Sequence, residues 1–246
     1  MKNILIIGAT SAMAEAVARR YAGEAARFAL VARDAGKLQV LVADLQARGA
    51  AAVAVETWDA QDVSALPRVI EAAWSALGEV DIALIAHGTL PDQVRAESDL
   101  AYAIDHFRVN GESALACMLC LAARFEPQGR GVLAVIGSVA GDRGRGSNYL
   151  YGAAKASVDA AASGMRARLF KKGVHVLTIK PGFVATPMTA GLNLPAKLTV
   201  TADRVAGDIV KAVAAQTDVL YTPWFWSFIM RIIRAIPGPV FKRSKL

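Results

Sequence analysis

Short apolar runs alternate with longer segments of helical periodicity, and this alternation constrains the fold more than any other feature. The apolar runs, typical of strands buried on both faces, cover residues 3–8, 27–32, 51–57, 80–88, 131–138, 173–182 and, more weakly, 218–223. Between them, a period of 3.6 residues predicts helices at roughly 11–22, 34–48, 62–77, 98–124, 148–171 and 201–216. Each helical segment is long enough to cross over a sheet, so the pattern predicts an α/β fold with a doubly wound parallel sheet.

The chain is long enough for one such domain with a large core. It has 246 residues, 54% of them hydrophobic, and no internal repeat or low-complexity linker appears before about residue 187. We expect a Rossmann-type core at 1–190, followed at 191–222 by a lid and the last helix and strand of the same domain. An amphipathic aromatic and basic tail then occupies 223–246.

The sequence predicts a cytoplasmic protein. It has no stretch of about 18 uncharged apolar residues, which argues against a membrane-spanning helix. Only Lys2 precedes the first apolar run, and that run is too short for the core of a signal peptide.

The two cysteines do not indicate a metal site. Cys117 and Cys120 lie three residues apart in a segment of helical periodicity, which puts both thiols on one buried face. A second cysteine pair is lacking, and His87, His106 and His175 are scattered along the chain. We therefore predict that the thiols pack in the core and that the protein has no metal centre.

A glycine ends the first predicted strand, in "ILIIGATSAMAEAVARRYA". Gly8 is followed by the hydroxyls of Thr10 and Ser11 at the N-terminus of a helix, where backbone amides and partial positive charge suit a phosphate group. Ala12 and Ala14 stand where a phosphate-binding turn is expected to have further glycines. Taken alone, the turn indicates dinucleotide binding no more strongly than it indicates an ordinary strand-to-helix connection.

The segment "VIGSVAGDRGRGSNYLYGAAKAS" contains residues suited to carbonyl chemistry. Ser138 ends a predicted strand, and Tyr151 and Lys155 lie one turn apart on one face of the next helix. A lysine ammonium beside a phenol lowers the phenol pKa, as a general acid/base requires. The serine hydroxyl can then donate to a substrate oxygen on which negative charge develops.

With these residues, the chain resembles the classical type of the short-chain dehydrogenase/reductase family. The matches follow the family's order over residues 1 to about 190: Gly8, Ser11 and Ala14 in the first turn, Asp59 after the third strand, Asn110 within "FRVNGESA", the set Ser138, Tyr151 and Lys155, and "PGFVATP" from Pro181 to Pro187. The resemblance implies an oxidoreductase that interconverts a carbonyl and an alcohol by hydride transfer with a nicotinamide cofactor.

The resemblance also implies a role for each matched residue. Tyr151 would exchange a proton with the substrate oxygen, Ser138 would orient the carbonyl, and Lys155 would lower the Tyr151 pKa and bind the nicotinamide ribose. Asn110 would hold a water of the proton relay. The full set of residues implied to bind the cofactor is Gly8, Thr10, Ser11, Met13, Arg33, Asp59, Ala86, Gly88, Tyr151, Lys155, Pro181, Gly182, Val184 and Thr186. Within that set, Asp59 would contact the adenine amine, and Thr186 with the Val184 backbone would fix the carboxamide.

One departure from the family pattern lies at "IAHG", residues 85–88, where an asparagine-rich "NNAG" is usual. Ala86 and His87 must therefore support the adjacent strand and the cofactor differently. On the family pattern His87 is expected to pack or to face the ribose, and a catalytic role is the alternative.

Charge at the end of the second strand favours NADP(H) over NAD(H). An NAD-specific enzyme is expected to have an acid there for the ribose 2′-hydroxyl, but Ala32 and Arg33 occupy the position. The Arg33 guanidinium can clamp the additional phosphate of NADP and stack on adenine. Asp34 then reads as the N-cap of the next helix.

The tail accounts for most of the net charge of +7. Trp224, Phe228 and Ile232 share one helical stripe, and five basic residues with no acid fall within 223–246. The stripe predicts either peripheral contact with the inner face of a membrane or packing against a second subunit or over the substrate pocket. Arg143 and Arg145 either meet an anionic group such as a substrate phosphate or lie in a solvated loop. Together with the tail, they resemble the branch of the family that reduces keto-sugars attached to polyprenyl phosphate, which implies a substrate of that class.

The expected partners are a small-molecule carbonyl or alcohol, hydrophobic or lipid-linked, and further copies of the chain in a homodimer or homotetramer. A non-catalytic NADP(H)-binding regulator is the alternative function, although such proteins usually lose part of the Ser, Tyr and Lys set. Nucleic-acid binding is not expected, because the basic residues cluster in an aromatic tail rather than on a polar face.

Overall fold

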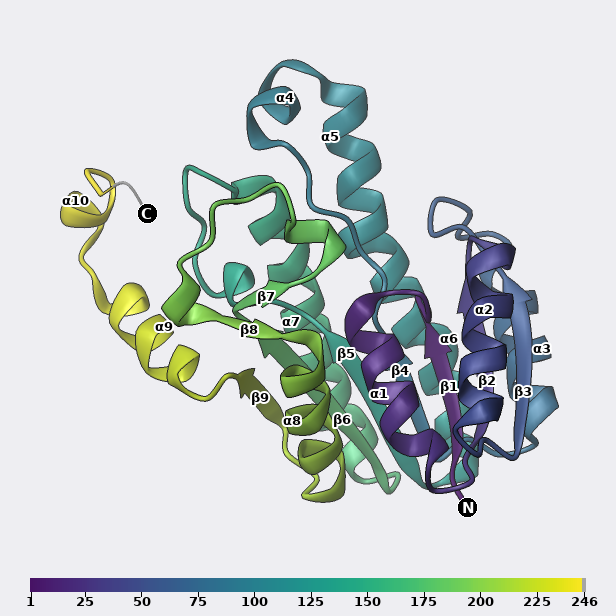
Figure 1. Ribbon diagram of the computed structural model, residues 1–246. Helices are drawn as coiled ribbons and strands as arrows, with labels where there is room; N and C mark the ends of the chain where they lie inside the picture. The colour runs from purple at the N-terminus through teal and green to yellow at the C-terminus, as the bar shows by residue number, and fades with distance from the viewer. Residues whose placement is uncertain (245–246) are drawn as a thin grey trace.

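Seven parallel strands form the central sheet of the computed structural model, which describes residues 1–244 (Figure 1). In spatial order β3-β2-β1-β4-β5-β6-β9, the sheet contains β1 (Asn3–Ile7), β2 (Arg27–Ala32), β3 (Ala52–Thr57), β4 (Ile82–Ile85), β5 (Gly131–Ile136), β6 (Val174–Pro181) and β9 (Val219–Thr222). All seven strands expected from the apolar runs are confirmed, and so is the doubly wound parallel sheet. The chain order reverses direction between β1 and β4, so the ligand-binding edge of such a sheet is expected there.

The helices cover both faces of this sheet. They are α1 (Ala12–Ala22), α2 (Ala35–Ala47), α3 (Leu66–Leu77), α4 (Gln93–Ser98), α5 (Leu100–Phe107), α6 (Ser113–Gln128), α7 (Tyr149–Phe170), α8 (Ala202–Ala214), α9 (Phe225–Ala235) and α10 (Gly238–Phe241). Alternate residues of β1 divide the core: Ile4 and Ile6 pack with α1, α2 and α8, while Leu5 and Ile7 pack with α3, α6 and α7. This division explains why the strands are apolar at every position.

The single helix predicted at 98–124 was wrong. The segment 93–128 contains α4, α5, a π-helical turn at Arg108–Glu112 and α6. Asp99 breaks the first junction because its side chain accepts from Tyr102 N at 3.0 Å and so caps α5. At the second junction the extra residue of the π turn lets Asn110 Nδ2 donate to His106 O at 2.9 Å.

A second, two-stranded sheet lies above the end of β6 (Figure 1). It pairs β7 (Phe183–Ala185) with β8 (Thr199–Thr201), and the lid segment 186–198 connects the two strands. Sequence analysis missed both strands because three residues are too few to show a period.

The tail forms a helix that is fastened to the domain. Trp226, Met230 and Ile233 on the inner face of α9 are buried against Val139, the residue after Ser138. Trp226 also lies so close to Gly182 that a Cβ added there would be 1.8 Å from the indole Nε1. No helix of the described residues is long and apolar enough to span a membrane.

Arg143 holds the far end of α9, which overturns both expectations for this side chain. Its Nη1 donates to the carbonyl of Ile236 at 2.7 Å and to that of Ile233, and its guanidinium lies 3.7 Å from the centre of the Phe241 ring. The carbonyls at a helix C-terminus lack partners within the helix, and a guanidinium satisfies several at once. Arg143 is therefore half-buried and engaged with the end of α9 rather than with a substrate anion.

We predict that Arg143→Ala loosens α9. The substitution leaves the terminal carbonyls without their donor, so amide exchange in 225–235 should quicken by about tenfold, equivalent to ~1.4 kcal/mol. Hydrogen exchange with mass spectrometry measures this, and Arg231→Ala, which removes an exposed arginine from the same helix, is the control. Equal protection in both variants would contradict the anchoring role.

Candidate active site

The carboxyl ends of β1, β4, β5 and β6 share one edge of the sheet. Gly8 follows β1, the segment 86–88 follows β4, Ser138 follows β5, and Gly182 follows β6. Backbone hydrogen bonds link these strand ends: Ala86 N donates to Ile7 O at 2.8 Å, and Gly137 N donates to Ile179 O at 2.8 Å. The fold thus gathers residues that are far apart in the sequence at one edge.

Gly8 allows the first turn to pass directly beside the end of β4. Its φ is +81°, and a Cβ there would lie 2.4 Å from His87 N, so no other residue fits without a backbone shift. Ser11 caps α1 by accepting from Ala14 N at 3.3 Å. Ala14 itself is fully buried, so it faces the core rather than a ligand. A close turn against a capped helix N-terminus fits a phosphate group.

Asn110 joins the segment after β4 to α5. Its Oδ1 accepts from Thr89 N at 2.9 Å and its Nδ2 donates to Thr89 Oγ1 at 3.1 Å. A Cβ on Gly88 would lie 2.9 Å from Asn110 Oδ1 and 3.6 Å from Lys155 Nζ. Gly88, Asn110 and Lys155 therefore meet at one point, and the absence of a side chain at 88 lets the backbone come this close to the Asn110 amide.

On the face of α7 that points at this edge, Lys155 is buried and Tyr151 is half-buried. Ser138 lies near Tyr151, and its Oγ accepts from Ala140 N at 3.1 Å. Lys155 Nζ donates to Ile136 O at 3.0 Å and lies 5.8 Å from the centre of the Tyr151 ring. Hydroxyl, phenol and ammonium are thus brought together as the sequence predicted.

Burial, and not Lys155, determines the direction of the Tyr151 pKa in this structure, and the lowering by Lys155 stays a prediction. Burial raises the pKa of Tyr151 to about 12, and the charge of Asp159 acts in the same direction against the hydrogen bond with Ser138. Burial likewise lowers the pKa of Lys155 to about 8, partly offset by Asp159. Desolvation is the largest cause of the shift for both groups.

His87 is half-buried and neutral. Burial lowers its pKa to about 3, and the charge of Lys155 adds to the effect. Ser113 Oγ gives its proton to Val109 O at 2.8 Å, so the 2.8 Å bond between His87 and Ser113 has Nε2 as donor. His87 Nδ1 is then an acceptor, buried and without a partner among the described residues. That unpaired acceptor fits a ligand hydroxyl.

A buried charge network behind Lys155 was missed by sequence analysis. Asp159 follows Lys155 by one turn of α7, and Lys180 Nζ lies 2.9 Å from its Oδ2. Lys180 also pairs with Asp142, which accepts from Tyr221 OH at 2.8 Å. Burial raises the pKa of Asp159, and the charge of Asp142 raises it further, against Lys180. The spacing Tyr151, Lys155, Asp159 was the available signal.

The loop after β6 is held by its own hydrogen bonds. Gly182 N donates to Thr222 O at 3.1 Å, so Pro181 and Gly182 are tied to the end of β9. Thr189 Oγ1 donates to Val184 O at 2.7 Å and accepts from Thr186 N at 3.1 Å. The loop thus has a fixed shape at the strand edge.

The residues expected at the adenine end lie on the surface. Arg33 is exposed after β2 and forms no ion pair among residues 1–244. Asp34 caps α2 by accepting from Lys37 N at 3.0 Å, as predicted. Asp59 is exposed after β3, and its Oδ1 accepts from Gln61 N at 3.0 Å. Thr10 and Met13 are half-buried near the first turn.

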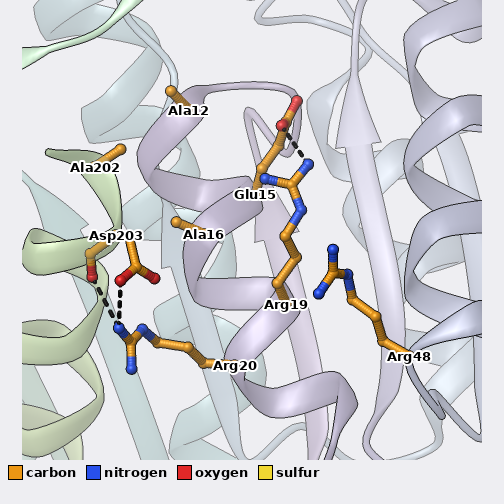
Figure 2. Close-up of a pocket in the computed structure, with 8 residues that line it drawn as sticks. All are labelled: Ala12, Glu15, Ala16, Arg19, Arg20, Arg48, Ala202 and Asp203. Atoms are coloured by element: carbon orange, nitrogen blue, oxygen red, sulfur yellow. Dashed lines mark hydrogen bonds and ion pairs between the residues drawn. The ribbon is translucent and has the colours of Figure 1, made fainter.

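A separate hollow of about 460 Å³ lies between α1, α2 and α8 (Figure 2). Its charged side chains are already paired, because Arg19 contacts Glu15 at 3.0 Å and Arg20 contacts Asp203 at 2.8 Å. The hollow includes none of the residues expected to bind cofactor or substrate, and its compensated charges do not indicate a ligand.

Both cysteines lie in the core of α6. Cys117 is fully buried, Cys120 is packed beside the same cluster, and burial raises the pKa of both thiols. Their structural interpretation therefore agrees with the packing.

Comparison with known proteins adds an independent finding. The sequence model of the short chain dehydrogenases matches residues 2–197. An uncharacterised oxidoreductase of Mycobacterium tuberculosis is 37% identical over 240 residues, which cover 98% of this chain and 96% of that protein. The ketoacyl reductase HetN of Nostoc is 28% identical over 88% of this chain and 76% of its own. The crystal structure of an actinorhodin polyketide ketoreductase with NADPH superposes with a TM-score of 0.81 at 20% identity, covering 92% of this chain and 97% of that one.

We predict that Lys155→Met stabilises the protein at neutral pH. Lys155 has a pKa of about 8 in the fold against 10.5 ordinarily, so below pH 8 the native state holds a charge that burial disfavours. The gain should be ~2 kcal/mol at pH 7, shrink as the pH rises from 8 to 10.5, and vanish above that range.

Urea unfolding across that pH range measures the gain. Lys37→Met, which removes an exposed lysine, is the control and should show no pH-dependent difference. A Lys155→Met protein less stable than wild type at pH 7 would mean that the bond to Ile136 outweighs desolvation.

Proposed function

This chain belongs to the short-chain dehydrogenase family of oxidoreductases, and from that premise we propose that it reduces a carbonyl to an alcohol with hydride from NADP(H), using Tyr151 as the proton donor. The observation that carries the proposal is the meeting of Ser138, Tyr151 and Lys155 at the carboxyl edge of the sheet. Membership in the family supports the oxidoreductase class, and the two related reductases named above act on keto groups by their names.

The protonation state of Tyr151 suits the proton donation that carbonyl reduction needs. A phenol with a pKa of about 12 keeps its proton at neutral pH. It can therefore give that proton to an oxygen on which negative charge develops, which is the step that reduction requires. Oxidation of an alcohol needs the phenolate, which is scarce at neutral pH.

The other residues of the site orient the substrate carbonyl and stabilise the groups that exchange the proton. Ser138 directs its hydroxyl toward both the phenol and the substrate oxygen, so it aligns the carbonyl for proton transfer. Lys155 brings positive charge close to the Tyr151 ring. Asn110 holds the backbone of Thr89, because its Oδ1 accepts from Thr89 N. The cofactor supplies the hydride, so the carbonyl carbon gains the hydride and its oxygen gains the Tyr151 proton.

The residues proposed to bind the cofactor divide between its adenosine half and its nicotinamide half. The Gly8 turn, with Thr10, Ser11 and Met13, would take the pyrophosphate at the N-terminus of α1. His87 Nδ1 would accept from a ribose hydroxyl in place of the usual asparagine. The loop from Pro181 to Thr186 would contact the carboxamide, while Ala86 and Asp59 would line the adenosine side.

Arg33 supports the preference for NADP(H). Its guanidinium is exposed after β2 with no acid paired to it among residues 1–244, and Asp34 is engaged in capping α2. A 2′-phosphate there would gain a charge-assisted contact, whereas a 2′-hydroxyl would find no carboxylate at the strand end.

The substrate class we propose is hydrophobic, with room for an anionic group. Of the two arginines between Ser138 and Tyr151, Arg143 is used to hold α9, but Arg145 Nε is buried without a partner among the described residues. A donor in that position suits a carboxylate or phosphate on the substrate.

We also propose that copies of the chain associate through α6 and α7. Leu115 and Leu119, one turn apart on α6, are exposed, and so is Phe170 at the end of α7. Apolar side chains at helical spacing on neighbouring helices suit a helix-on-helix interface.

We expect Tyr151→Phe to abolish turnover while leaving cofactor binding intact. The substitution removes the proton donor but keeps the ring, so kcat should fall by about 10²–10⁴ fold. NADPH oxidation at 340 nm with a panel of hydrophobic ketones measures turnover, and quenching of protein fluorescence measures NADPH binding. NADPH binding without turnover on any ketone, in the wild type, would instead favour a cofactor-binding regulator.

Replacing Arg33 with Ala should weaken NADPH binding far more than NADH binding. The lost charge-assisted contact predicts an increase in Kd for NADPH of about tenfold or more, with NADH little changed. Titration with both cofactors measures the ratio, and Arg48→Ala, at the other end of α2, is the control. Equal losses for both cofactors would overturn the NADP(H) assignment.

A further inference from the structure

Helix α9 has two apolar faces, and only one of them is covered. Trp226, Met230 and Ile233 bind the inner face to the domain. On the opposite side, Trp224, Phe228 and Ile232 are 73%, 60% and 52% exposed. Exposed aromatics at a spacing of four residues form a continuous stripe on a helix that is already anchored. The sequence predicted this stripe, and the structure shows it open to solvent.

Cationic side chains flank the stripe. Arg231 and Arg234 are exposed on α9, and Lys242 and Arg243 are exposed just after α10. No aspartate or glutamate occurs in 223–246, and Lys245 lies outside the described residues. The surface formed by α9 and α10 is therefore apolar along its centre and positive at its rim.

A hollow of about 400 Å³ opens beside the stripe, between α9 and the edge strand β9. Trp224 and Tyr221 form part of its wall, and Arg231 and Arg234 stand at its side. Neither arginine forms an ion pair with a described residue. An apolar hollow beside two unpaired guanidinium groups suits a lipid headgroup phosphate next to its acyl chains.

A second copy of the chain is disfavoured at this surface. Two copies meeting here would bring positive rims together with no acid on either side, and like charges in contact cost free energy. An anionic bilayer offers the opposite charge, and its interface is where tryptophan rings are enriched.

We propose that the outer face of α9 docks the protein on an anionic lipid bilayer, with Trp224, Phe228 and Ile232 entering the interface and Arg231 and Arg234 contacting headgroup phosphates. Figure 1 shows α9 leaving the sheet beyond β9, on the same side as the lid strands β7 and β8. Because α9 packs on Val139 and Gly182, docking would hold the candidate active site at the membrane. This deepens the proposed function by making a lipid-linked carbonyl the substrate class, but docking itself does not depend on turnover.

Vesicle sedimentation of the full chain tests the proposal without substrate or cofactor. Wild-type protein should pellet with vesicles of phosphatidylcholine mixed with phosphatidylglycerol and much less with phosphatidylcholine alone. Binding should weaken several-fold as NaCl rises from about 0.05 M to about 0.5 M, because salt screens the headgroup contacts.

Paired variants separate the two contributions. Trp224→Ser with Phe228→Ser should lower the partition coefficient by about tenfold or more on anionic vesicles. Arg231→Gln with Arg234→Gln should remove most of the preference for phosphatidylglycerol. Val40→Ser with Val94→Ser changes exposed apolar residues on α2 and α4 and should bind vesicles like the wild type.

Three outcomes would overturn the proposal. One is wild-type protein that stays in the supernatant with anionic vesicles at low salt. Another is an equal loss of vesicle binding in the variant changed at Val40 and Val94. The third is a dimer in analytical ultracentrifugation that the Trp224 and Phe228 substitutions dissociate, which would make a second copy the occupant. NADPH turnover on soluble ketones, measured separately, tells a failure of docking from a failure of the proposed reaction.

Discussion

The packing of the charged face of α7 against the carboxyl edge of the sheet is the constraint on which the rest of this structure depends. Tyr151, Lys155 and Asp159 follow one another along α7, where Lys155 is buried and the other two are half-buried. Charges in such a place need partners inside the protein. The ends of β5 and β6 supply them through Ile136 O and Lys180. Gly137 and Gly141 let the backbone come close enough, since a Cβ on either would collide with the Asp159 carboxylate at 2.6 and 2.8 Å.

Contacts next to the same network extend to β9 and α9. Asp142 accepts from Tyr221 at 2.8 Å, which ties the loop after Ser138 to β9, and its neighbour Arg143 ties the loop to α9. Val139 packs into the cluster beneath α9. The segment between the serine and the tyrosine is thus held from the α7 side by ion pairs and from the tail side by carbonyls and apolar contacts. A loop fixed on two sides keeps the serine in place, as a positioned hydroxyl requires.

Local patterns were enough to predict the sheet, most helices and the residues at the strand ends, because each depends on the periodicity of one segment. Three features needed contacts between distant segments. The break at Asn110 arises from a side chain that bonds His106 O. The sequence alone gives no sign that Arg143 contacts α9, because the two segments are far apart along the chain. The pKa of Tyr151 follows from how deeply α7 is buried, and spacing to Lys155 carries no information on burial.

The contact between Gly182 and Trp226 links two positions that are 44 residues apart in sequence. The indole occupies the place of a side chain at 182, so neither position can change freely while the other stays the same. In related sequences, a residue larger than glycine at 182 should accompany a small residue at 226, and the tail should then take another path. The pair can therefore serve as a marker in alignments that separates relatives sharing this arrangement of the tail from those that share only the core.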